Sequence, residues 1–112
     1  MNETSIFTLT HEGELNAVSS AQLKERIQAA LGEGHRWLVI DLARVPFIDS
    51  SGLSVLVGGL KAVKLAGGEM ALAALQEQAA TIFSITSAHR LFEIHPTVAA
   101  AEASLQARVA EG

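Results

Sequence analysis

Residues 37–75 read WLVIDLARVPFIDSSGLSVLVGGLKAVKLAGGEMALAAL, and this stretch decides the fold. Trp37–Ile40 is apolar without alternation, which predicts a central strand covered on both faces, with Asp41 near its end. After a connection that contains Pro46, apolar residues recur at threes and fours and predict a helix of about four turns. These residues are Leu53, Leu56, Val57, Leu60 and Val63. Gly67-Gly68 ends that helix and Glu69–Leu75 is strand-like, so residues 36–75 predict two parallel strands joined by a right-handed helical crossover.

The segment before this unit predicts a hairpin and then a helix. Ser5–Thr10 alternates apolar and polar residues, as a strand with one buried face does. Glu12-Gly13 supplies a turn, and Glu14–Asn16 returns as a short second strand. We expect Ser19 or Ser20 to cap the helix that follows. Its buried face comprises Leu23, Ile27, Ala30 and Leu31, and Gly32 and Gly34 end it.

The segment after the unit continues the alternation of helix and strand. Residues 76–88 predict a third amphipathic helix, and Leu91–Ile94 predicts a short edge strand. Pro96 opens a last helix, whose inward residues are Val98, Ala101, Leu105 and Val109. The sequence therefore predicts an α/β fold: a single domain over residues 1–112, with a mixed β-sheet and amphipathic helices.

Composition excludes several classes of protein. With 112 residues, 49% of them hydrophobic, the chain is large enough for one core and too apolar to be disordered. It contains no cysteine, which excludes disulfides, thiolate metal sites and thiol catalysis. No apolar run is long enough to cross a bilayer, and the N-terminus lacks the pattern of an export signal, so we expect a cytoplasmic protein without membrane insertion. A net charge of −4 argues against direct binding to nucleic acid.

Side chains that could support catalysis are not grouped in this sequence. The four histidines, at positions 11, 35, 89 and 95, lack the spacing of metal ligands. Asp41 and Asp49 are the only aspartates, and nothing in the sequence brings two carboxylates into one cleft. Neither Ser51 nor any other nucleophile has a base at a recognisable spacing. We therefore expect a protein that is not an enzyme and holds no metal.

Two adjacent glycines, Gly58-Gly59, lie inside the second predicted helix, where each costs about 1 kcal/mol relative to alanine. A nucleotide-binding loop is one explanation, but no phosphate-binding glycine motif surrounds them. A close approach of the helix to the sheet or to a partner is the explanation we favour.

Asp49-Ser50-Ser51-Gly52 is the one motif left that could carry a function, because it lies where a strand has ended and a helix begins. Asp49 or Ser50 is expected to cap the helix, which puts Ser51 in the first turn with its hydroxyl near solvent. A phosphate there would meet the positive end of the helix dipole and would repel an acidic or apolar partner surface. An ordinary helix cap without regulation remains the alternative. Phe47 and Ile48, just before the motif, could be core residues or part of an exposed contact patch.

The segment Leu38–Leu56, LVIDLARVPFIDSSGLSVL, resembles the signature of STAS domains, in particular bacterial anti-sigma factor antagonists. Gly13-Glu14-Leu15 resembles the early Gly-Glu-Leu-Asp of this family, and Ala66–Glu69 resembles the stretch before its fourth strand. Leu91–Ile94 followed by Pro96 resembles its late segment, so the similarity extends over nearly the whole chain.

The resemblance implies a partner-switching mechanism. The unphosphorylated antagonist would bind an anti-sigma factor that is also a serine kinase, phosphorylation of Ser51 would release it, and a serine phosphatase would reset the switch. Asp49, Ser50, Ser51, Gly52 and Asn16 would then form the partner-binding site. ATP would belong to the kinase, so this chain would need no cofactor of its own.

Two positions depart from the family pattern, and a second function stays open. Asn16 stands where the family has an acid, and Ser87-Ala88-His89 replaces the usual turn before the late strand. The alternative function is a constitutive STAS scaffold subunit of a larger assembly, such as a lipid-transport ATPase complex or a stress-sensing particle. In that assembly the motif would be a docking surface without a phosphate cycle.

Overall fold

A computed structural model describes residues 5–111 of the chain and contains four parallel strands, each followed by helical structure. The strands are β1 (Ile6–Glu12), β2 (Trp37–Arg44), β3 (Glu69–Ala73) and β4 (Glu93–His95). The helices are α1 (Ala17–Gly32), α2 (Ser50–Leu65), α3 (Glu77–Ile85), the short 3₁₀ helix η2 (Ala88–Arg90) and α4 (Val98–Glu111). The α/β architecture expected from the sequence is confirmed.

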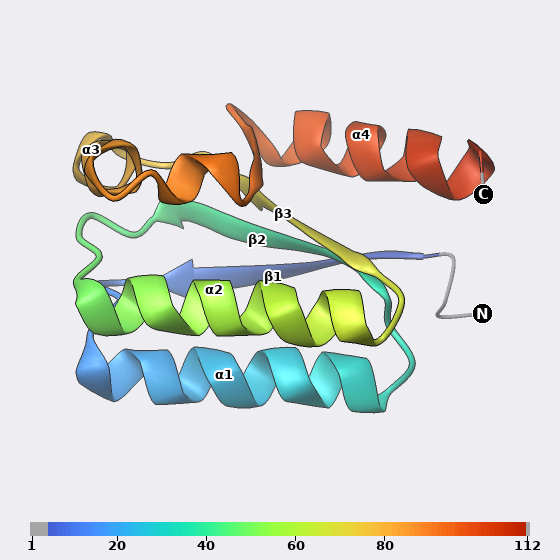
Figure 1. Ribbon diagram of the computed structural model, residues 1–112, viewed down its shortest axis with the longest axis horizontal. Helices are drawn as coiled ribbons and strands as arrows, with labels where there is room; N and C mark the ends of the chain where they lie inside the picture. Colours follow the sequence, from blue (N-terminus) through green and yellow to red (C-terminus); the bar gives the residue numbers. More distant parts are fainter. Residues whose placement is uncertain (1–4, 112) are drawn as a thin grey trace.

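The sheet follows the order of the chain, β1-β2-β3-β4, and every pair of neighbouring strands in the described residues is parallel. A helix joins each strand to the next, as parallel neighbours require. Figure 1 shows α1 and α2 side by side along one face of the sheet and α4 along the other face. Parallel strands all end at the same edge of the sheet, the one formed by their C-terminal ends. Because α1 follows β1 and α2 follows β2, both helices begin at that edge.

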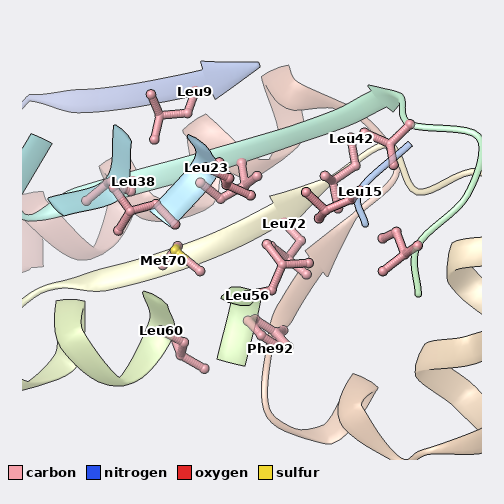
Figure 2. Close-up of a cluster of buried hydrophobic side chains, with 14 of the residues drawn as sticks. Leu9, Leu15, Leu23, Leu38, Leu42, Leu56, Leu60, Met70, Leu72 and Phe92 are labelled. Carbon is pink, nitrogen blue, oxygen red and sulfur yellow. The ribbon is translucent and has the colours of Figure 1, made fainter. Parts of the chain in front are cut away.

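The main core lies between the sheet and the pair of helices α1 and α2. Leu38, Ile40, Met70 and Leu72 point from β2 and β3 into this core and are completely buried. Figure 2 shows Leu56 and Leu60 of α2 beneath the same cluster. A smaller core lies under α4 and contains Val39, Ala71, Ala73, Ala101 and Leu105. Its small β3 side chains allow α4 to lie close to the sheet.

Carboxylates on β3 and β4 hold the C-terminal half of α4 on the sheet. Arg108 contacts Glu69 Oε2 at 3.1 Å and Glu93 Oε1 at 2.6 Å, and the Ser104 hydroxyl donates to Glu93 Oε2 at 2.9 Å. Burial raises the pKa of Glu93, but hydrogen bonds to His95 and Ser104 and the charge of Arg108 outweigh it, so this pKa lies below its usual range. Glu93 therefore stays ionised and paired at neutral pH.

The predicted N-terminal hairpin is wrong, and with it the antiparallel part of a mixed sheet. After β1 the chain turns at Gly13, which has a positive φ of 88°, and the Gly13 N–H donates to the Arg44 carbonyl. Leu15 then forms an isolated parallel bridge with Ile48. Leu15 is also completely buried. The segment around it therefore packs beside the end of β2 and does not run back along β1.

Candidate functional site

The two loops that precede α1 and α2 are joined at the edge of the sheet where the strands end. The Leu15 N–H donates to the Phe47 carbonyl at 2.9 Å, and the Asp49 N–H donates back to the Leu15 carbonyl at 3.2 Å. Asn16 and the segment Asp49–Gly52 are therefore brought together, although 33 positions separate Asn16 from Asp49. All five residues that the sequence singled out for partner binding lie at this edge.

Asp49 is the N-cap of α2, as one of the two sequence-based alternatives predicted. Its backbone is extended and its Oδ1 accepts a hydrogen bond from the Gly52 N–H at 3.0 Å. Since α2 begins at Ser50, Ser51 is the second residue of the helix and lies in the first turn. The negative cap and the aligned peptide dipoles are the arrangement expected at a helix start.

Ser51 is half-buried and lines an open groove, whereas Ser50 is exposed. Neither hydroxyl makes a hydrogen bond to another of residues 5–111. The Ser51 oxygen is therefore not sealed in the core, and the groove leaves room for an added group.

Gly52 is buried, and the contacts at its α-carbon are internal ones. A Cβ added there would lie 2.5 Å from the Leu15 carbonyl oxygen, 2.8 Å from Leu15 Cγ and 3.0 Å from Ile48 Cγ2. The close approach that glycine permits at this position is thus between α2 and the Leu15 segment.

Gly52→Ala is expected to destabilise the protein by about 1–3 kcal/mol, because the clash involves backbone that cannot move without breaking the Leu15 hydrogen bonds. Urea unfolding followed by circular dichroism measures the change. Gly58→Ala is the matched control within the same helix, because a Cβ at Gly58 meets no atom within 4 Å. Equal or greater stability of Gly52→Ala than of the wild type would contradict the tight approach.

Asn16, expected to contact a partner, is the N-cap of α1. Its Oδ1 accepts from the Val18 N–H at 3.0 Å and the Ser19 N–H at 3.1 Å, and the Asn16 N–H donates to Ser19 Oγ at 3.0 Å. The prediction that Ser19 or Ser20 caps this helix is therefore wrong, because Asn16 and Ser19 form a reciprocal capping box. Asn16 is half-buried, so part of its surface stays open at the site edge.

Gln78 of α3 positions the site, although the sequence offered no signal for it. Its side-chain oxygen accepts from the Ile48 N–H at 2.8 Å, and its side-chain nitrogen donates to the Ile48 carbonyl at 3.0 Å. This pair of hydrogen bonds fixes the backbone immediately before Asp49. The Gln78 amide thus pairs with both the N–H and the carbonyl of Ile48, as the backbone of a neighbouring strand would.

Two apolar side chains are exposed in the loop before α2 and at the start of α1. Phe47, in the loop before α2, is 42% exposed. Val18, in the first turn of α1, is 78% exposed. Ile48 is completely buried. Of the two residues just before the Asp49–Gly52 motif, Phe47 is therefore part of the surface and Ile48 is part of the core.

The groove runs between α1 and α2 and has a volume of about 680 Å³. Most of its lining residues are small, and Lys24 is the only charged one. The lining comprises Ala17, Ser20, Ala21, Lys24, Ile27, Gln28, Ser50, Ser51, Ser54, Val55, Gly58, Gly59 and Ala62. Sequence reasoning did not find this groove, and its one signal was the glycine pair inside a predicted helix.

The histidines do not form one cluster, although His89 and His95 line the same small cavity beside α3. His35 stacks on Phe7 with ring centroids 4.0 Å apart, His89 faces the Phe83 carbonyl, and His95 pairs with Glu93. Within residues 5–111 no three side chains of the metal-binding types come together. In the same part of the chain, no helix is both long and apolar enough to cross a bilayer.

A model of the STAS domain family matches residues 2–101. The chain belongs to the STAS domain family. Among curated proteins, the anti-sigma-B factor antagonist of Bacillus subtilis is 37% identical over 82 residues, which cover 73% of this chain and 74% of that protein. This likeness places the chain among the anti-sigma factor antagonists, which are non-enzymatic STAS proteins.

Solved structures support the same assignment. A crystal structure of a protein from Thermotoga maritima superposes with a TM-score of 0.84 at 27% identity, covering 90% of this chain and 87% of that one. The anti-sigma factor antagonist SpoIIAA, solved in unphosphorylated and phosphorylated forms, gives TM-scores of 0.75 and 0.69. The two forms cover 90% of this STAS chain at 19% and 20% identity, and 88% and 91% of their own chains, so they show a shared fold.

Proposed function

We propose that this STAS domain is a phosphorylation-controlled partner switch. Its unphosphorylated form binds an anti-sigma factor that is also a serine kinase, and phosphorylation of Ser51 ends the contact. Asp49, Ser50, Ser51, Gly52 and Asn16 make up the partner-binding site. In this division of roles Ser50 and Ser51 meet the partner, while Asp49, Gly52 and Asn16 hold the two loops in place. The exchange takes place in the cytoplasm.

The position of Ser51 is the observation that carries this proposal. It lies in the first turn of α2 and lines an open groove, and its hydroxyl has no hydrogen-bonding partner among residues 5–111. A side chain held at a helix start with a free hydroxyl is open to an approaching active site. The exposed Phe47, in the loop before α2, and the exposed Val18, in the first turn of α1, supply apolar surface for a partner.

The chemistry of modification is a phosphoryl transfer. The Ser51 oxygen forms a bond to the γ-phosphorus of ATP held by the kinase, the bond to ADP breaks, and the hydroxyl proton passes to a base of the kinase. A phosphatase reverses the change by hydrolysis with water. The phosphate adds about −1.5 to −2 charges.

The same helix can tolerate that charge. Unpaired N–H groups and the dipole at the start of α2 favour an anion, and Lys24 lines the groove that Ser51 faces. Asp49 opposes it, because a second negative group then lies two residues away. Phosphorylation is therefore expected to act on the partner interface and to leave the domain folded. SpoIIAA, which shares the fold, has been solved in a phosphorylated form.

The experiment that tests this function is phosphorylation in vitro. The purified protein is incubated with ATP and, one at a time, with each anti-sigma factor kinase encoded in its own genome, and intact mass and peptide mapping locate any phosphate. We expect one phosphate, on Ser51, and none in Ser51→Ala. Ser50→Ala is the matched control and should still be modified. A phosphate placed only elsewhere, or none with any of these kinases, would contradict the proposal.

The constitutive scaffold predicts a different result. A scaffold subunit would bind its assembly equally well with serine or aspartate at position 51, and it would carry no phosphate. Binding that is insensitive to Ser51→Asp would therefore favour the scaffold over the switch.

A further inference from the structure

The two glycines inside α2 have different surroundings. A Cβ added at Gly59 would lie 2.8 Å from Ile27 Cδ1, so this glycine allows α2 to pack against α1. A Cβ at Gly58 would meet no atom within 4 Å. Gly58 is also exposed and has an ordinary helical backbone. Glycine is the least favourable residue of a helix interior apart from proline, and no contact within residues 5–111 explains it at position 58.

Gly58 lies on the wall of the α1–α2 groove. Small residues on both helices keep the groove open, with Ala17 and Ala21 on α1 and Ala62 further along α2. The lining on α1 extends from Ala17 to Gln28, about 16 Å at a rise of ~1.5 Å per residue. A groove of this length between two helices, with small residues on its walls, can hold a third helix packed at close distance.

The charge of the groove indicates what kind of helix it accepts. Lys24 is the only charged residue of the lining, although the whole chain has 12 acidic and 8 basic residues. The remaining polar lining consists of serine hydroxyls and the Gln28 amide. An acidic side chain of a partner can therefore enter the groove without meeting a carboxylate and can pair with Lys24.

The groove is continuous with the proposed phosphorylation site, because Ser50, Ser51 and Ser54 are part of its lining. We propose that the groove receives an amphipathic helix of the anti-sigma factor, with small apolar residues on the buried face and a carboxylate that pairs with Lys24. This inference rests on the proposed function and adds how release occurs. A phosphate on Ser51 brings negative charge into the groove occupied by an acidic helix, and both repulsion and volume expel it.

Two substitutions test the groove in the 112-residue chain, with an anti-sigma factor kinase that binds the wild type as the probe. Gly58→Leu fills the groove and should weaken binding at least tenfold without lowering the thermal midpoint, because leucine is a better helix former and its Cβ has free space. Lys24→Glu should also weaken binding at least tenfold by reversing the charge. Arg90→Glu, an exposed position outside the lining, is the matched control and should change affinity less than twofold.

Cross-linking identifies the occupant. The chain contains no cysteine, so Ala21→Cys carries a single photoreactive label in the groove, and Ala107→Cys carries one on exposed α4. We expect Ala21→Cys to cross-link to a helical peptide of the kinase that contains acidic residues, and Ala107→Cys not to. Cross-linking of Ala21→Cys to a second copy of this chain, or to a basic or non-helical segment, would overturn the proposal.

The outcomes separate the groove from the switch. If Ser51→Asp loses the partner while Gly58→Leu and Lys24→Glu bind like the wild type, the groove proposal is wrong and the switch stands. If an anti-sigma factor kinase binds the wild type and is lost by the groove variants but never phosphorylates Ser51, the switch is wrong and the groove stands as a constitutive docking site. If no anti-sigma factor kinase binds the wild type, both are wrong.

Discussion

Ser51→Asp is expected to weaken binding to the anti-sigma factor by at least ~100-fold, which corresponds to about 3 kcal/mol. The aspartate places a permanent negative charge on the wall of the groove, at the position where the proposed partner makes contact. Like charges brought together at an interface that excludes water cost several kcal/mol, because the new carboxylate and the acidic partner helix repel each other and both lose water. Titration calorimetry with the purified kinase measures the affinity directly.

The effect is specific to the interface if the variant stays folded. An acidic residue in the first turn of a helix is favourable to the helix dipole, so the thermal midpoint of Ser51→Asp should match that of the wild type. Ser51→Ala should bind at wild-type affinity and stay bound in the presence of ATP. Ser84→Asp, exposed on α3, adds the same charge outside the groove lining and should leave binding unchanged. Wild-type affinity of Ser51→Asp would contradict control by charge at this position.

The elements that the sequence predicts well are those with local signals. The strand Trp37–Ile40, the cap at Asp49 and the end of α2 near Gly67 depend on residues close together in the chain, and the structure contains all three. The hairpin failed because the fate of Glu14–Asn16 depends on a distant residue, Ile48, which Leu15 pairs with in parallel. No local pattern in Glu14–Asn16 distinguishes a short antiparallel strand from a buried segment that pairs in parallel with a distant residue.

The candidate site divides in the same way. The Asp49–Gly52 motif carries its own geometry, since a cap and a first turn are properties of consecutive residues. The groove arises from the packing of α1 against α2, and the hydrogen bonds of Gln78 to Ile48 arise from the packing of α3 against the loop before α2. The sequence shows both only indirectly. Gly58 is the exception, because a glycine inside a helix conflicts with local propensity and so marks a position where something else matters.

Ile40→Asp is expected to unfold most of the protein at 25 °C. Ile40 is completely buried in β2 and lies in register between Leu9 of β1 and Leu72 of β3, so its neighbours on both sides are apolar. A carboxylate at this position would lose its hydration and gain no hydrogen-bonding partner, at a cost of several kcal/mol. That cost is comparable to the ~5–15 kcal/mol that stabilises a domain of this size.

Urea titration followed by circular dichroism measures this loss, with two controls in the same strand. Ile40→Val removes one methylene and should cost only about 0.5–1.5 kcal/mol. Ala43→Asp introduces the same carboxylate at an exposed position of β2 and should change the free energy of unfolding by about 0.5 kcal/mol or less. The contrast between positions 40 and 43 isolates burial from charge, because both variants carry the same side chain on the central strand. A midpoint for Ile40→Asp close to that of Ala43→Asp would mean that β2 does not lie in the core, and the arrangement of sheet, caps and groove derived from it would be wrong.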